Sequence, residues 1–374
     1  MQRSVPSQTV RALRTRAQGL RPPSDRPSST TVAGVIDRVE VQAQEEKAAA
    51  LQVRARSTGL TRDDVERART EDRAVIRIWL MRGTLHLVTP TNLEWLLPLL
   101  GPHFVKAGRR RLLSLWRNED TLQRGLRELV RALDERPLTR EELREHLLRK
   151  GLPAAGQASI HLVRYAALQG DLCYGPSRDG KESFVLLRDW IKYAPRPPSD
   201  DTLAALTRRY LAGYGPATPA DMAAWAGLPL ELVLRGWRLV EHELSEVRVD
   251  GRTSALWFLG EAEGELESAA GPVQVRLLGR FDTYILGYDD RELLYESAHA
   301  RRVNAGGGLI RPTLAVDGRF VGTWGLDSRP KLAAVSVEPF GRLPQKAERG
   351  LLEETKDVGR FLGISTRLAP NQRP

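Results

Sequence analysis

Two glutamines separated by one residue, Gln42 and Gln44, are the side chains whose types and spacing point most clearly to chemistry. They follow a largely apolar run, 32–41, and precede the charged start of a helix, 45–47. In an extended segment, positions i and i+2 point to the same face, so the two carboxamides would lie side by side. Each carboxamide offers one acceptor oxygen and two N–H donors, and a pair can hold a water molecule. Because the pair is uncharged, it is a weak base. It therefore suits a substrate whose reaction needs little help from a general base.

Glutamine pairs at this spacing also occur on protein surfaces without any catalytic role, so the surrounding elements matter. A helix capped by Ser29 to Thr31 is predicted before them, and another helix after them. A β-hairpin that bends at Gly83 would complete a first domain, residues 1–90. The predicted helices are 9–20, 32–38, 47–56 and 65–70, and the predicted strands are 75–80 and 84–88.

The same order, helices followed by a two-stranded hairpin, recurs in residues 91–197 and in residues 198–262. In the third occurrence, Thr218 and Pro219 are typical of a helix start, and the pair Asp250-Gly251 predicts a tight hairpin. Three-helix packets followed by a hairpin are typical of winged helices, although an assorted α/β chain would give a similar pattern. We therefore predict three tandem winged-helix domains.

The last segment, residues 263–374, changes to strands and ends in a helix, 349–361. The pair Asp317-Gly318 predicts another tight hairpin in this segment. Five or more short alternating strands predict a small β-barrel. The expected fold class is therefore α+β, with three tandem winged-helix motifs and a C-terminal small β-barrel. The predicted strands are 273–278, 281–286, 309–316, 319–324 and 332–337.

The composition points to an acidic partner and excludes several classes of site. The net charge is +10, and only eight of the 57 basic residues are lysines. An arginine-rich basic surface suits DNA phosphates, although a GC-rich genome also raises the arginine content. One cysteine excludes an internal disulfide, the six histidines show no metal spacing, and no phosphate-binding glycine motif occurs. We therefore expect no metal and no cofactor.

The sequence gives no sign of a membrane or secreted protein. No apolar run approaches the ~20 residues of a membrane span, and the first residues lack the apolar core of a signal peptide. We therefore expect a cytoplasmic protein without a membrane partner.

Several short motifs occur in the order in which one known family carries them. They are Met81–Val88, Tyr214–Thr218, Phe281-Asp282, Leu286-Gly287, Asp290-Arg291, Arg311-Pro312 and Val316–Arg319. With Gln42-Ala43-Gln44 at the expected place, nearly the whole chain resembles the winged-helix DNA-binding family that includes the AlkZ-type DNA glycosylases. The resemblance implies three tandem winged helices bent into a C shape, with a C-terminal barrel. It also implies excision of N7-alkylated purines from double-stranded DNA, including bulky natural-product adducts and interstrand crosslinks.

The chemistry of such a substrate agrees with the two glutamines. Alkylation at N7 gives the base a positive charge, weakens the glycosidic bond and lets the base leave as a neutral molecule. A water held by Gln42 and Gln44 near the anomeric carbon would supply the remaining help. Lys47 is the nearest lysine to the motif, so we expect a monofunctional, hydrolytic DNA glycosylase rather than a Schiff-base lyase. Its role would be DNA repair or self-resistance to a DNA-alkylating antibiotic, and the lesion stays open.

Eight further residues are candidates for DNA contacts. Arg54 and Arg56 end a predicted helix, and Arg82 and His86 lie on the first hairpin. The resemblance implies that the hairpin with Arg319 at its tip enters the minor groove. For each residue a second interpretation is open, because His86 suits a hydrogen-bonded core position and the arginines suit solvent. The full set is Arg54, Arg56, Arg82, His86, Arg301, Arg302, Arg311 and Arg319.

The alternative function is a non-catalytic winged-helix DNA-binding protein or transcriptional regulator, with Gln42 and Gln44 in contact with DNA or merely exposed. Such regulators are usually smaller dimers with one DNA-reading head, whereas three fused winged helices favour a monomer that wraps damaged DNA. A family member that binds lesions without excising them is a third possibility. Release of a base from alkylated DNA distinguishes the enzyme from both.

Overall fold

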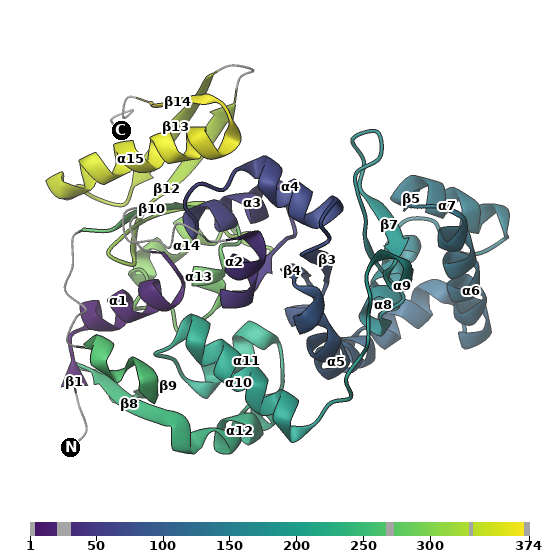
Figure 1. Cartoon of the computed structure of the whole chain (residues 1–374), viewed down its shortest axis with the longest axis horizontal. Coiled ribbons are helices and arrows are strands. Elements are labelled where there is room, and N and C mark those ends of the chain that lie inside the picture. Colours follow the sequence, from purple (N-terminus) through teal and green to yellow (C-terminus); the bar gives the residue numbers. More distant parts are fainter. Residues whose placement is uncertain (1–3, 21–30, 267–272, 329–331, 370–374) are drawn as a thin grey trace. The chain divides into compact units, whose positions relative to one another are not determined.

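Figure 1 shows the computed structural model, which describes residues 4–20, 31–266, 273–328 and 332–369 of the chain. The chain divides into two compact units. Unit 1 contains Met1–Val65 and Leu203–Pro374, and unit 2 contains the intervening residues Glu66–Thr202. Because a compact unit can contain more than one domain, the four domains expected from the sequence remain a prediction.

The helices of unit 1 come from both ends of the chain. Helix α11 begins with the predicted cap, where Thr218 Oγ1 accepts from Asp221 N at 3.0 Å and the Asp221 carboxylate accepts from Thr218 N. It ends at Gly227, whose φ of 71° suits a residue without a side chain. The helices are α1 (Ser7–Ala17), α2 (Val32–Arg38), α3 (Glu46–Ala55), α10 (Asp200–Tyr214), α11 (Pro219–Ala226), α12 (Leu230–Leu239), α13 (Thr283–Leu286), α14 (Ala300–Val303) and α15 (Gln345–Leu362).

A small three-stranded sheet in unit 1 joins the N-terminal segment to the predicted third hairpin. Strands β8 (Leu244–Val249) and β9 (Ala255–Leu259) are antiparallel, and β1 (Ser4–Val5) lies parallel to β8. The turn between β8 and β9 uses Gly251 with a φ of 76°, as the Asp-Gly pair predicted. Apolar side chains of α1 pack against this sheet, so residues 5–13 share a core with residues 247–258.

The second sheet of unit 1 is a half-barrel. The expected β-structure of the C-terminal segment is therefore confirmed, as a half-barrel sheet. Neighbouring strands are antiparallel except β13 and β14, which are parallel and are connected through α15. Helix α15 packs its apolar face on this sheet (Figure 1). The strands are, in sheet order, β10 (Val275–Leu278), β11 (Thr313–Val316), β12 (Arg319–Ser328), β13 (Leu332–Pro339) and β14 (Ser365–Leu368).

One predicted strand of this segment, 281–286, is wrong, because the chain forms the short helix α13 there. Its aromatic and β-branched residues favour a strand, but the Asp282 carboxylate accepts from Tyr284 N at 2.9 Å and begins a helical turn. Phe281 precedes this turn with a φ of 55°. Local capping therefore overrides strand propensity at this point.

Unit 2 consists of four longer helices, two short ones and a sheet with the order β4-β3-β6-β7-β5. The predicted helix end at Gly101-Pro102 is wrong, because α5 continues through both residues. Gly101 instead lets the backbone at Leu168 approach the helix closely, since a side chain there would come within 2.3 Å of the Leu168 carbonyl oxygen. The elements are α4 (Arg62–Thr70), β3 (Ile76–Trp79), β4 (Leu85–Val88), α5 (Pro90–Trp116), α6 (Glu119–Glu135), β5 (Leu138–Thr139), α7 (Arg140–Arg149), α8 (Ala158–Gln169), β6 (Leu172–Tyr174), β7 (Ser183–Leu186) and α9 (Leu187–Trp190).

Candidate active site

The two glutamines lie in unit 1 at the junction between a short strand and helix α3. Strand β2 (Val41–Gln42) ends at the first glutamine, and Gln44 lies in the bend before α3. Gln42 is buried, whereas Gln44 is exposed. Strand β2 ends before Gln44, so the side-chain alternation of a regular strand does not set the direction of the Gln44 side chain. Gln44 is thus accessible to a substrate, whereas Gln42 is largely enclosed.

Gln52, a buried glutamine of α3 that the sequence analysis missed, holds the backbone of the motif. Its Nε2 donates to the Gln42 carbonyl oxygen at 3.0 Å, and its Oε1 accepts from Thr283 N at 3.2 Å. The carboxamide therefore joins the motif, α3 and the start of α13 by neutral hydrogen bonds. The sequence signal was a polar residue at a position of α3 whose neighbours along the helix are apolar.

Arg56, expected to contact DNA, is instead buried in an ion pair. Its two Nη atoms donate to the two oxygens of Asp282 at 3.0 and 2.7 Å, and they also bond Gln18 Oε1 and the Gln52 carbonyl oxygen. Such a two-bond pair with a carboxylate is a strong and directional contact. The expected phosphate contact at Arg56 is therefore wrong, because its donors already bind protein groups inside unit 1.

Arg54 requires the same correction. Its side chain is 0% exposed, with Nη1 2.8 Å from Asp357 Oδ2 and Nη2 3.0 Å from Glu354 Oε2. Burial alone would lower the pKa of Arg54, but the carboxylates of Glu354 and Asp357 outweigh burial and raise it. Arg276 shares Glu354 at 3.0 Å. The guanidinium of Arg54 thus fixes α3 to α15 rather than to a DNA phosphate.

A charged pair lies beside the exposed glutamine. Glu45, which follows Gln44, is 3.0 Å from Arg280, and both side chains are partly exposed. Arg280 stands in a turn that packs closely on α3, where a side chain at Gly279 would come within 3.1 Å of the Ala48 carbonyl oxygen. Sequence reasoning missed this pair, since its members are 235 residues apart. The geometry places one carboxylate and one guanidinium next to the glutamine that faces solvent.

His86 and Arg82, in unit 2, form a hydrogen-bonded pair. His86 is buried, its Nδ1 is 3.0 Å from the Thr84 carbonyl oxygen, and its Nε2 is 3.4 Å from Arg82 Nη2. Burial first, and then the Arg82 charge, lower the pKa of His86 to about 3. The imidazole is therefore neutral, donates through Nδ1 and accepts through Nε2. The expected phosphate contact at His86 is wrong, whereas that of Arg82 stays a prediction.

The arginines of the C-terminal segment divide into two groups. The hairpin tip before Arg319 is packed inside unit 1, where Tyr284 Oη donates to the Gly318 carbonyl oxygen at 3.0 Å, and Arg319 itself pairs with Glu296. Arg319 is nevertheless exposed, so its entry into a DNA groove stays a prediction. Arg302 donates to the Pro339 carbonyl oxygen at 3.1 Å and lies over the Phe340 ring. Arg301 and Arg311 are exposed as well, and with Arg82 and Arg319 they remain the candidates for DNA contacts.

Membrane-spanning helices and metal-binding clusters are both absent from the described ranges. No helix there is long and apolar enough to cross a membrane. Within the same residues, histidine, cysteine, aspartate and glutamate side chains form no group of three that could hold a metal ion.

Comparison with known proteins identifies the family. The model of the family described as DNA glycosylase AlkZ-like matches residues 37–361. The chain belongs to the AlkZ-like DNA glycosylase family. A curated relative named interstrand DNA cross-link repair glycosylase, from Streptomyces sahachiroi, is 32% identical over an alignment of 361 residues, and the match covers 92% of this chain and 93% of that protein. The solved structure of the Streptomyces sahachiroi DNA glycosylase AlkZ matches with a TM-score of 0.79 and 28% identity, over 98% of this chain and all of the other.

The membership confirms the expected enzyme class with its DNA substrate and the coarse fold, whereas the catalytic role of the glutamine motif stays a prediction. The protein is an enzyme of the DNA glycosylase class and its substrate is DNA, so the alternative of a non-catalytic regulator is set aside. The mixed α+β fold with its half-barrel agrees with the matched structure. The glutamine motif, residues 42–44, lies inside the matched range.

Proposed function

We propose that this protein hydrolyses the N-glycosidic bond of N7-alkylated purines in double-stranded DNA, including bulky adducts and interstrand crosslinks, as part of DNA repair. The observation that carries the proposal is the 32% identity, over 92% of the chain, to a relative named for interstrand cross-link repair. The order of elements supports a tandem winged-helix architecture, since α10, α11 and α12 are followed directly by the β8–β9 hairpin. We further propose that the protein acts as a monomer.

The geometry of the motif supports a division of work between the two glutamines. Gln44 is exposed and therefore meets the deoxyribose from the solvent side, whereas Gln42 is buried and fixes the attacking water with it. The Glu45 carboxylate lies next along the chain and favours the positive charge that develops on the sugar. Arg280, 3.0 Å from Glu45, keeps that carboxylate in place, and its partly exposed guanidinium offers a contact for a DNA phosphate.

A neutral water-holding site is sufficient because the leaving group is activated already. A purine alkylated at N7 carries a positive charge and departs as a neutral base, so the enzyme needs only to place the water and stabilise the sugar cation. The exposed Lys47 is on α3 beyond the motif, and hydrolysis needs no amine. A monofunctional enzyme follows, which leaves an abasic site and an intact backbone.

The first test measures base release from duplex DNA with one N7-methylguanine, using alkaline cleavage of the abasic product. Wild type should release the base, and Gln44→Ala should lower the single-turnover rate by about 100-fold or more, in the range of losing a positioned dipole. Since Gln44 is exposed, the variant should keep the unfolding free energy of wild type within about 0.5 kcal/mol. Equal rates for the two proteins would exclude the glutamine motif as the catalytic centre.

A second substrate tests which lesions the enzyme accepts, separately from how it breaks the glycosidic bond. Duplex DNA with a nitrogen-mustard crosslink between two N7 atoms should be unhooked, and the products should separate on a denaturing gel. Release of methylguanine without unhooking would restrict the proposal to single adducts. Borohydride trapping should give no covalent protein–DNA product, and a trapped product would overturn the monofunctional mechanism.

A further inference from the structure

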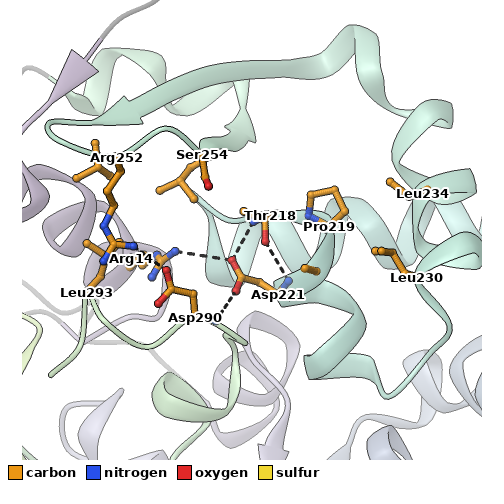
Figure 2. Close-up of a pocket in the computed structure, with 13 residues that line it drawn as sticks. Arg14, Thr218, Pro219, Asp221, Leu230, Leu234, Arg252, Ser254, Asp290 and Leu293 are labelled. Carbon is orange, nitrogen blue, oxygen red and sulfur yellow. Dashed lines mark hydrogen bonds and ion pairs between the residues drawn. The ribbon is translucent and has the colours of Figure 1, made fainter. Parts of the chain in front are cut away.

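A cavity of about 390 Å³ lies in unit 1, away from the glutamine motif in the sequence (Figure 2). The start of α11, two residues of α12 and the β8–β9 hairpin line it, together with the segment 290–293 and one residue of α1. Its volume is at the small end of the range for ligand pockets. The apolar members of the lining are Pro219, Ala220, Leu230, Leu234, Val249, Leu256 and Leu293.

The α12 side of the cavity exposes apolar side chains to solvent. Leu230 is 47% exposed and Leu234 is 38% exposed, although both line the cavity. They are four residues apart on one helix and therefore share a face. Two neighbouring exposed leucines beside a cavity favour an apolar ligand body, because a ligand there would remove both from water.

The α1 side of the cavity carries a buried guanidinium with an unused donor. Arg14 is 1% exposed, its Nε donates to the Pro216 carbonyl oxygen at 2.9 Å, and its Cζ lies 3.8 Å from the Tyr288 ring centroid. Its Nη1 has no hydrogen-bond partner among the described residues. Other buried arginines also leave a nitrogen unbonded, such as Nε of Arg56, but of these arginines only Arg14 lines this cavity. A buried donor without an acceptor is costly, so an acceptor that enters the cavity would be favoured.

The two carboxylates of the lining are already paired, as Figure 2 shows. Asp221 accepts from Thr218 N at 3.0 Å and from Asp289 N at 2.9 Å, and it lies 4.0 Å from Arg14. Asp290 pairs with Arg252 at 2.6 Å. The charges of the lining therefore balance, and the cavity offers no free carboxylate for a cationic ligand.

We propose that this cavity binds a small, largely apolar molecule that carries a carbonyl or carboxylate oxygen. The oxygen accepts from Arg14 Nη1, and the apolar body covers Leu230 and Leu234. The site is separate from the glutamine motif and does not depend on the lesion that the enzyme excises.

The test compares three probes of one shape, titrated calorimetrically into the full-length protein: biphenyl-4-carboxylate, biphenyl-4-carboxamide and biphenyl-4-ylmethylammonium. The two acceptor probes should bind, and the ammonium probe should bind at least tenfold more weakly, since it leaves Nη1 unpaired. Tighter binding of the carboxylate identifies an anionic ligand, and tighter binding of the carboxamide identifies a neutral one. No binding of any probe at millimolar concentration, or equal binding of all three, would overturn the proposal.

Two variants locate the binding. Leu234→Glu should weaken both acceptor probes at least tenfold, because it places a charge at the apolar face of the cavity. Leu352→Glu, at a leucine of α15 that is 49% exposed and does not line the cavity, is the matched control and should change nothing. Arg14→Met should abolish the preference for the acceptor probes. If Arg14→Met does not fold, the probe series and Leu234→Glu still decide, and undiminished binding to Leu234→Glu contradicts the site.

Discussion

Unit 1 buries arginines in two regions that treat the guanidinium in opposite ways. In the α3 polar cluster, formed by Gln52, Arg54 and Arg56, both arginines have a carboxylate oxygen within 3.0 Å. In the cavity, the carboxylate beside Arg14 is 4.0 Å away, and one Nη has no hydrogen-bond partner among the described residues. Burial is nearly complete in both regions, so burial alone does not distinguish a structural arginine from one poised for a ligand.

The difference lies in what surrounds the donors. A guanidinium enclosed by carboxylates holds elements together, and its removal leaves buried charges unpaired. A guanidinium that borders an open space with a donor unused can gain a partner from solution. The comparison therefore assigns support of the glutamine motif to the α3 polar cluster and ligand recognition to the cavity.

The largest effect should come from breaking the α3 polar cluster at Arg54. Arg54→Met leaves Glu354 and Asp357 without one of their cations, and the free energy of unfolding should fall by about 3 kcal/mol in urea titrations. The matched control is Arg349→Met on α15, whose exposed pair with Glu353 should contribute within about 0.5 kcal/mol. If both variants lose the same small amount, the α3 polar cluster does not hold this region together.

The next effect concerns catalysis through Gln52. Gln52→Leu removes the bond to the Gln42 carbonyl oxygen, so the motif loses its position and the single-turnover rate should fall about tenfold, with the DNA dissociation constant unchanged. Gln52→Glu is the companion variant, because it keeps the acceptor for Thr283 N but places a second acceptor and a negative charge against the Gln42 carbonyl oxygen. It should lose at least as much rate as Gln52→Leu. A change in DNA affinity instead of rate would make Gln52 part of the DNA-binding surface.

His86 extends the comparison to a buried, paired group in unit 2, and it predicts a pH dependence. Its pKa is about 3 in the folded protein and near 6.5 when unfolded, so the unfolded chain binds the proton more readily. Stability is therefore retained above pH 6.5 and is lost as the pH falls from 6.5 toward 3. Between pH 7 and pH 5 the loss from this residue alone should be about 2 kcal/mol.

Unfolding titrations at both pH values, with His86→Gln as the comparison, measure this contribution. The variant should be less stable at pH 7, and it should lack the part of the pH dependence that belongs to the imidazole. An identical pH slope in wild type and variant would show that His86 is not buried as a neutral group.

Local signals predicted the turns and caps of the fold but not the partners of its charges. The hairpins at Asp250-Gly251 and Asp317-Gly318 and the cap at Thr218 form as expected, because each depends on a few adjacent residues. The pairing of Arg56 with Asp282 spans 226 residues, and no local pattern encodes such a pair. The sequence thus predicted these turns and this cap, whereas it assigned to DNA two arginines that fold into the protein, and the catalytic role of the glutamine motif stays a prediction.

The smallest effect concerns Arg301 and Arg311, the exposed counterparts of the buried arginines. They lie close together, because Arg311 N donates to the Val303 carbonyl oxygen at 2.9 Å, two residues from Arg301, and Asn304 bridges Ile310. Replacing both by glutamine should leave the stability within about 0.5 kcal/mol and reduce the slope of log affinity against log salt by about 1 for each DNA phosphate that these arginines neutralise. Arg349→Gln, exposed on α15, is the control and should keep the wild-type slope. An unchanged slope in the double variant would show that DNA does not bind at this loop. Contact of accessible arginines with DNA phosphates would then have to be tested at Arg82 and Arg280.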